Sequence, residues 1–429
     1  MNRATCAVLF LGTLSLVGRG VVGCASNVEL GTADDAVSDG ATPSDAGTLP
    51  DTPEVDGAVG DADASDAART CSLDGWCYTE LPARGTFDAG GIVVPSPRSL
   101  FDLRSVWVAP DHRVWAVSDA GHILCWDGSR WDVVFAASER LLSITGTSST
   151  DIWVSGYQGL VLHGTTVNGT MTFEVVSTGM RRGVTAITAL SPTDVWILAD
   201  QPYHLTAETL GSTPAFTEID IPKGFTETRS WLTIATAWND GTNVWFAGTE
   251  VANCSMPPCR AEAVAWRYLE GTDPATAWER VSIPIQEANT LYSGVTTGDG
   301  MNLVSFHGTS DTGLVHGWVA RFAPSDAGTI TPLPGGSGGV TTDGAYAWSA
   351  EIAEVHGVPN GIWAEQKNDI WLVGSPGVVR HFNGTSWELQ RVALKPTIPL
   401  LANLWGIHGR GDDVWIVGDS VALHRTVKP

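Results

Sequence analysis

One repeated unit dominates the sequence, and it is clearest in VWVAPDHRVWAVSDAGHILCWDGSRWDVV (106–134) and GIWAEQKNDIWLVGSPGVVRHFNGTSWELQRV (361–392). Both stretches contain an apolar strand, a polar turn, a strand with Val-Trp or Ile-Trp, a glycine turn, a third apolar strand, an Asp-Gly or Asn-Gly turn, and a fourth strand led by Trp. Short apolar runs bounded by Gly, Asn and Asp are typical of strands joined by tight hairpins. Each unit is therefore predicted to form a four-stranded antiparallel sheet.

The second-strand motif recurs seven times, as Val114-Trp115, Ile152-Trp153, Val195-Trp196, Val244-Trp245, a degenerate Leu303-Val304, Ile370-Trp371 and Val414-Trp415. A propeller blade occupies ~40–50 residues, and the longer spacings here coincide with insertions around 254–259 and 335–351. The final copy, 404–429, has only three strands, whereas residues 75–81 match the Trp-led fourth strand. We therefore predict an all-β, seven-bladed β-propeller closed by an N-terminal outer strand, which leaves no open sheet edge between the chain ends.

Tryptophan is the second signal of the repeat, with 19 Trp against 6 Tyr and 11 Phe. An indole at a fixed point of the second strand can pack between adjacent twisted sheets, so these residues are expected to form the core between blades. Other Trp fit the repeat less regularly, and at the mouth of a ring indoles can stack on sugars or peptides. Trp363 and Trp405 are our candidate ligand-stacking residues.

The repeat resembles those of known extracellular propellers. Asp-Val-Trp followed by a glycine turn and Trp-Asp-Gly-x-x-Trp is similar to the repeat of tectonin-type propellers. It is also similar to the Asp-box (BNR-like) and photosystem II assembly-factor-like repeats in lipoproteins of myxobacteria and related Gram-negative bacteria. The resemblance covers residues 75–429 and implies a propeller that binds glycans or proteins, whereas the catalytic residues of the sialidase branch are not assignable in this sequence.

The N-terminus has the layout of an export signal. Residues 1–23 contain Arg3, an apolar stretch and small residues, and Val21-Val22-Gly23-Cys24 resembles a bacterial lipobox. We expect a lipoprotein-type signal peptide over 1–23 and lipidation of Cys24, with Ala25 favouring the outer membrane or cell surface. Plain secretion or periplasmic release is the alternative, because Gly23 to Ala25 also fits an ordinary cleavage site.

Residues 24–70 are predicted to be a disordered acidic linker. The segment 25–70 contains 11 acidic residues against Arg69 alone and has no aromatic residue, so it cannot bury enough surface to offset its ordering entropy. The spacing of the acidic residues could also indicate a site for divalent cations, but the segment lacks the mid-loop Gly and the terminal Glu of a calcium loop. The propeller itself is assigned to 71–429.

The charge of the chain limits its partners. With 24 Lys plus Arg against 47 Asp plus Glu, the formal charge is −23, which argues against nucleic acid as a partner and favours a cationic, neutral or metal-bridged ligand. No apolar run reaches the ~20 residues of a spanning helix, so contact with a membrane is expected only through the lipid anchor.

Residues suited to catalysis or metal binding mostly occupy repeat positions. His163, His381 and His424 end the third strand of their copies, where Cys125 stands in the first copy, so they are predicted to be structural. The acidic turn residue, Asp413 in the last copy, returns as Asp151, Asp194, Asn243 and Asp369 and is expected to accept backbone hydrogen bonds. With no zinc spacing or nucleophile elbow, we predict no metal, no cofactor and no catalytic residue.

Export implies an oxidising compartment, in which cysteines form disulfides. Cys254 with Cys259 and Cys71 with Cys77 are the simplest pairs, and Cys77 with Cys125 is an alternative. Taken together, the sequence predicts a surface-exposed lipoprotein whose propeller binds a protein or glycan at one face. A protein-binding or scaffold module is the first reading, a tectonin-like lectin the second, and a carbohydrate-active hydrolase or lyase with converging carboxylates the third.

Overall fold

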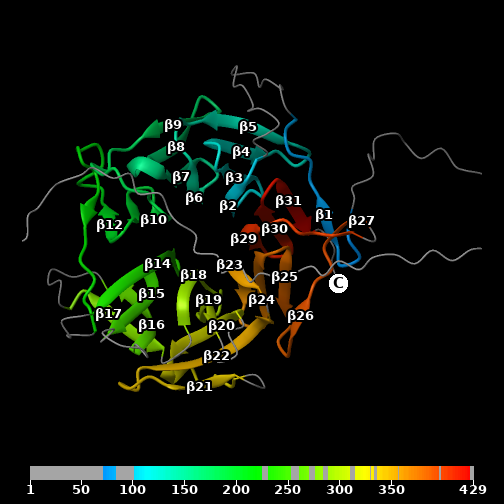
Figure 1. Cartoon of the computed structure of the whole chain (residues 1–429). Helices are drawn as coiled ribbons and strands as arrows, with labels where there is room; N and C mark the ends of the chain where they lie inside the picture. Colours follow the sequence, from blue (N-terminus) through cyan, green and yellow to red (C-terminus); the bar gives the residue numbers. More distant parts are fainter. Residues whose placement is uncertain are drawn as a thin grey trace, which may run out of the picture. The chain divides into compact units, whose positions relative to one another are not determined.

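The structure is a computed structural model that describes residues 71–83, 101–224, 230–252, 260–269, 276–283, 288–309, 315–328, 330–332, 336–355, 357–395 and 398–425. Apart from two short 3-10 turns, η1 (Tyr157–Gly159) and η2 (Ser325–Ala327), the regular elements in these ranges are strands. Among the described residues no helix has the length and apolar character needed to span a membrane. Seven sheets surround one axis in chain order (Figure 1), which confirms the predicted seven-bladed propeller.

Each blade runs outward from an innermost strand. Blade 1 contains β2 (Leu103–Val108), β3 (Val114–Ser118), β4 (His122–Trp126) and β5 (Trp131–Ala136), and blade 2 contains β6 (Leu141–Ser148), β7 (Asp151–Gly156), β8 (Val161–Val167) and β9 (Thr170–Val175). Blade 3 contains β10 (Ala186–Ser191), β11 (Asp194–Leu198), β12 (Pro202–Leu205) and β13 (Thr217–Glu218). Blade 4 contains β14 (Trp231–Asn239), β15 (Val244–Ala252), β16 (Arg260–Tyr268) and β17 (Trp278–Ile283).

Blades 5 and 6 contain β18 (Ala288–Thr296), β19 (Asn302–Thr309), β20 (Val315–Pro324), β22 (Tyr346–Val355) and an extra outer strand β21 (Ser337–Val340); and β23 (Val358–Gln366), β24 (Asp369–Ser375), β25 (Val378–Phe382) and β26 (Trp387–Leu389). The glycine-rich insertion thus supplies a fifth strand to blade 5. The link to blade 7 carries a small hairpin of β27 (Ala393–Lys395) and β28 (Ile398–Pro399).

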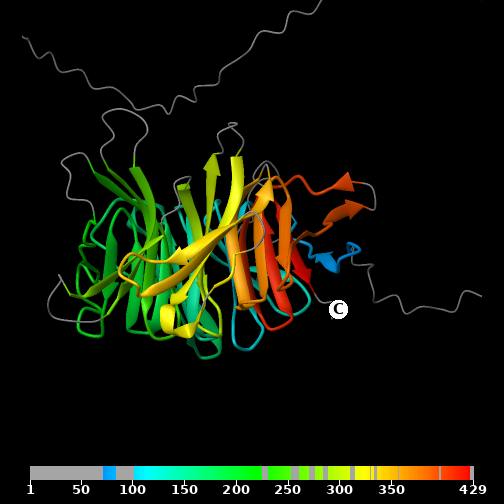
Figure 2. The same cartoon turned by 90° about the horizontal axis from the view of Figure 1, so that it is seen from below.

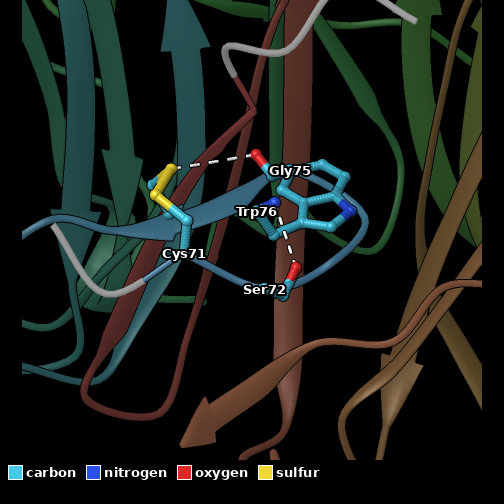
Figure 3. Close-up of a disulfide and its surroundings, with 5 residues drawn as sticks. Cys71, Ser72, Gly75 and Trp76 are labelled. Carbon is cyan, nitrogen blue, oxygen red and sulfur yellow. Dashed lines mark hydrogen bonds between the residues drawn. A yellow bond between two sulfur atoms is a disulfide. The ribbon is translucent and has the colours of Figure 1, made fainter. Parts of the chain in front are cut away.

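Blade 7 joins the two ends of the propeller. Its strands are β29 (Leu404–Arg410), β30 (Asp413–Gly418), β31 (Val421–Arg425) and, outermost, β1 (Trp76–Tyr78). Trp76 pairs with Arg425 and Tyr78 with Leu423 in antiparallel register, which confirms closure by an N-terminal strand. A disulfide joins Cys71 to Cys77 around this strand, and the Trp76 amide donates to Ser72 Oγ at 3.1 Å (Figure 3).

A belt of aromatic rings holds neighbouring blades together. The six second-strand Trp are at most 2% exposed, as predicted for core residues: Trp115, Trp153, Trp196, Trp245, Trp371 and Trp415. Five of them meet, edge to face, an aromatic ring from the fourth strand of the following blade: Trp115 with Phe173, Trp196 with Trp278, Trp245 with Tyr346, Trp371 with Trp76, and Trp415 with Trp131. Because such pairs bury large apolar surfaces in a favoured geometry, they explain why Trp recurs twice per blade.

The alternation of strand direction defines two ends of the ring, seen from the side in Figure 2. The connection face carries the links between blades and the turns between second and third strands. The hairpin face carries the turns between first and second strands and between third and fourth strands. The innermost strands run from the connection face to the hairpin face around the axis of the ring (Figure 1), and residues of all seven line a central channel.

Candidate functional site at the mouth of the channel

Six innermost strands contain a β-bulge at the same place near the connection face. The pairing with the second strand skips one residue there, and the skipped residues are Arg104, Leu142, Ala235, Tyr292, Asn360 and Trp405. A bulge re-aims a side chain out of the regular pleat. All six are partly exposed, and their identity differs in every blade, although the residue that follows is always small.

Most of these side chains are fixed to the end of the second strand of their own blade. Arg104 forms an ion pair with Asp119, and Trp405 Nε1 donates to Asp419 Oδ1 at 2.6 Å. Asn360 Nδ2 donates to Ser375 Oγ at 3.0 Å. In blade 5 the corresponding pair is Tyr292 Oη with His307 Nδ1 at 2.6 Å. The bulged residues are therefore held in defined orientations around the channel mouth.

At the mouth of the channel, side chains of blades 7, 1 and 2 contact one another in one continuous surface. We call it the Arg–aromatic arc, and it consists of Trp405, Arg104, Asp119, Arg140 and Tyr157. The Arg104 guanidinium lies 4.3 Å from the centre of the Trp405 ring, and that of Arg140 lies 5.0 Å from the Tyr157 ring. Asp119 accepts a hydrogen bond from each arginine. Burial alone would raise the pKa of Asp119, but these two hydrogen bonds hold it below its usual value.

The arc combines rigidity with accessibility. Asp119 is 15% exposed, whereas Arg140 is 51% and Tyr157 is 40% exposed. Two guanidinium groups share one carboxylate, and a guanidinium has five N–H donors, so Arg140 retains donors that face solvent. The arc can therefore offer both aromatic surface and cationic hydrogen-bond donors to a partner, in a protein that is otherwise strongly acidic.

Below the bulges, the channel contains a cavity of about 490 Å³ lined by all seven innermost strands. Trp363 lines this cavity with only 4% of its surface exposed, whereas Trp405 belongs to the rim and is covered on one side by Arg104. The structure thus places the two candidate stacking residues at different depths. Trp405 belongs to the arc and Trp363 does not.

The other residues singled out in the sequence lie elsewhere. Cys71 and Cys77 form the disulfide at the closing strand, and Cys125 is a buried free thiol. Cys24, Cys254 and Cys259 lie outside the described residues. Sequence reasoning missed Arg104, Arg140 and Tyr157. The available signal was a residue that differs between units and lies between Leu and a small residue in four of them, as in Leu103-Arg104-Ser105 and Leu404-Trp405-Gly406.

The repeated His and Asp residues form partly buried structural clusters on the second-strand Trp. In blades 2, 3, 6 and 7 the imidazole stacks on the second-strand Trp with ring centres about 4 Å apart and binds the Asp that precedes that Trp: His163 with Asp151, His204 with Asp194, His381 with Asp369, and His424 with Asp413. The expectation that these carboxylates bind backbone amides is wrong for the described residues, because their partners are side chains. An imidazole binds each of the four, an indole N–H also donates to Asp194, Asp369 and Asp413, and the Thr147 hydroxyl donates to Asp151. Within the described residues no group of three or more His, Cys, Asp or Glu is placed to hold a metal ion.

No protein-family model and no curated protein matches this sequence. Among solved structures, a YCF48 structure described as bound to D1 peptide aligns with 84% of this chain and 99% of its own, at 14% identity and a TM-score of 0.50. YCF48 from Cyanidioschyzon merolae aligns with 77% of this chain and 97% of its own, at 13% identity and a TM-score of 0.50. At these identities the likeness establishes the propeller fold alone.

Proposed function

We propose that this protein is a protein-interaction module that binds its partner at the Arg–aromatic arc. The arc is the observation that carries the proposal, because Trp, Tyr and Arg are the residues most enriched at the energetic centres of protein interfaces. These side chains lie on strands and on the connections between them and hold one another through two hydrogen bonds and two cation–π contacts, which lowers the entropy lost on binding. That a propeller of similar fold is described with a bound peptide supports a peptide or protein as the ligand.

The arc also suggests what the partner segment contains. The net charge of −23 favours a neutral or cationic partner as a whole, but the contact surface itself is locally rich in guanidinium. A carboxylate of the partner could bind Arg140, and an apolar side chain could pack on Tyr157 and on the partly exposed Leu142 in the bulge of blade 2. We therefore expect a segment that combines an acidic side chain with an aromatic or aliphatic one.

The remaining part of the proposal concerns location. We propose that the chain is exported, lipidated at Cys24 and displayed at the outer membrane or cell surface by its acidic linker. The lipobox-like Val21-Val22-Gly23-Cys24 supports this, as does the resemblance of the repeats to tectonin-like and Asp-box lipoprotein propellers. An exported scaffold of this kind would hold its partner near the membrane.

Site-specific photo-crosslinking in the producing cell tests the arc directly. A photoreactive residue at Leu142, in the bulge of blade 2, is compared with one at Val167, which is 53% exposed at the hairpin end of the same blade. A protein crosslinked from position 142 but not from 167, and lost when Arg140→Ala is added, supports the proposal. Crosslinks from both positions alike, or none from 142, would contradict it. Binding of the purified chain to a glycan array in that case would point to the lectin alternative.

A further inference from the structure

Three ring N–H donors stand at one level of the channel, in three consecutive blades. Trp363 of β23, His408 of β29 and Trp107 of β2 occupy equivalent positions of their strands, and all three line the cavity of about 490 Å³. They lie three residues beyond the bulges, which is ~10 Å along a strand. They therefore form a level of the channel distinct from the Arg–aromatic arc.

The two indoles lack a hydrogen-bond acceptor for a reason visible in the repeat. Trp238 occupies the same position in blade 4, and its Nε1 donates to Thr296 Oγ1 of the next blade at 2.9 Å. In the blades after Trp107 and Trp363, the place of Thr296 is taken by Gly146 and Gly409, against which the two rings pack.

In the part of the chain that the structure describes, neither the Trp107 nor the Trp363 N–H makes a hydrogen bond, although the side chains are only 7% and 4% exposed. Their nitrogens also differ from the unpartnered Nε1 atoms of Trp115 and Trp153, which are fully enclosed by protein. Both indoles line the cavity, which is where their nitrogens can meet a ligand.

His408 supplies the third donor because its tautomer is determined by the backbone. The Val108 N–H donates to His408 Nδ1 at 3.1 Å, so Nδ1 carries no hydrogen. Burial, reinforced by the charge of Arg410, lowers the pKa of His408 to about 4, and the ring is therefore neutral at physiological pH. A neutral imidazole that accepts at Nδ1 must carry its hydrogen on Nε2.

We propose that Trp107, Trp363 and His408 form an oxyanion-binding site in the channel, one that accepts a small organic acid or an inorganic oxyanion. Weakly solvated N–H groups without acceptors are costly, and an anionic oxygen is the strongest acceptor that can satisfy several of them at once. The cavity has one charged side chain of each sign, Arg410 and Glu365, and Glu365 already accepts from the Gly411 N–H at 3.2 Å. The three N–H groups, rather than net charge, therefore select the ligand.

The cavity volume indicates how the two kinds of oxyanion should differ. About 490 Å³ is within the range of ligand sites, and far exceeds what a single inorganic anion fills. An organic acid can place its carboxylate on the three donors and its remaining atoms against polar side chains such as Thr188 of blade 3 and Asn239 of blade 4 on the opposite wall. Citrate should consequently bind more tightly than phosphate or sulfate if the site takes organic acids.

The test follows the indole N–H signals of the ¹⁵N-labelled full chain by NMR during titration with citrate, acetate, phosphate and sulfate at constant ionic strength. The Trp107 and Trp363 signals should shift and saturate, while the Trp238 signal should not move. Trp363→Phe and Trp107→Phe keep the ring and remove the donor, and each should weaken binding about tenfold. Trp238→Phe is the matched control and should leave the affinity unchanged.

Two outcomes would overturn the proposal. One is that none of the four anions produces more shift at Trp107 and Trp363 than sodium chloride does, which would mean that the donors are satisfied by channel water. The other is that Trp238→Phe weakens binding as much as Trp363→Phe does. The first of these outcomes is measured on the wild-type chain, so the proposal can be overturned even if a variant does not fold.

Discussion

Replacing Trp76 with Ala should destabilise the propeller at the seam where its two ends meet. Trp76 is 0% exposed, and its ring lies 5.4 Å from that of Trp371 at an interplanar angle of 80°. A buried indole removes ~150–250 Å² from water, which at ~25 cal/mol per Å² corresponds to about 4–6 kcal/mol. Because the denatured chain already buries part of this area, and measured Trp→Ala losses are ~3–5 kcal/mol, we expect a loss of about 4 kcal/mol.

Guanidinium chloride unfolding of the oxidised chain measures this loss. The midpoint should fall while the slope with denaturant stays unchanged, because the surface exposed on unfolding is nearly the same. Trp231→Ala is the matched control, since Trp231 is 48% exposed at the start of β14, and it should cost less than about 1 kcal/mol. Equal losses in the two variants, or a loss below about 1 kcal/mol for Trp76→Ala, would refute the view that the N-terminal strand closes the ring through this indole.

Three further predictions concern titration, reactivity and lipidation. The pKa of His408 is about 4 in the folded protein against 6.5 in the unfolded chain, so the contribution of the neutral ring to stability is complete above about pH 6.5 and disappears as the pH falls toward 4. The difference in unfolding free energy between wild type and His408→Gln should therefore shrink by up to about 3 kcal/mol over that range. A constant difference would contradict the assignment. Burial raises the pKa of Cys125 to about 12, so alkylation at about pH 8 should leave Cys125 unmodified in the native protein and modify it after unfolding, as peptide mass spectrometry would show. Labelling in the native state would contradict this prediction. Cys24→Ala should abolish incorporation of labelled fatty acid and release the protein from the membrane fraction, and a variant that still carries label would exclude Cys24 as the anchor.

Much of the fold was accessible from the sequence because its signals are local and repeated. Strand alternation, turn residues and the Val-Trp pair lie within a few residues of one another, and seven copies make each feature recognisable even where Leu303-Val304 has lost the Trp. The fourth-strand character of residues 75–81 could be recognised by the same comparison, and β1 occupies Trp76–Tyr78 within that range. The structural role of His424 was also predictable, since a residue repeated in several blades serves the blade. Its partner atoms were not, because a hydrogen bond depends on side-chain placement.

The candidate sites depend on contacts between blades, and these the sequence alone did not reveal. Arg104 meets Trp405 only because ring closure brings blade 7 beside blade 1, and Val108 meets His408 across the same seam. A bulge is likewise a property of the pairing between two strands, so Arg104 and Trp405 are ordinary strand residues until the register is known. The blade, its core and the number of copies could be predicted, because they follow from short-range periodicity. The variable residues that gather at the channel could not, because closing the ring joins positions about 300 residues apart that no local pattern relates.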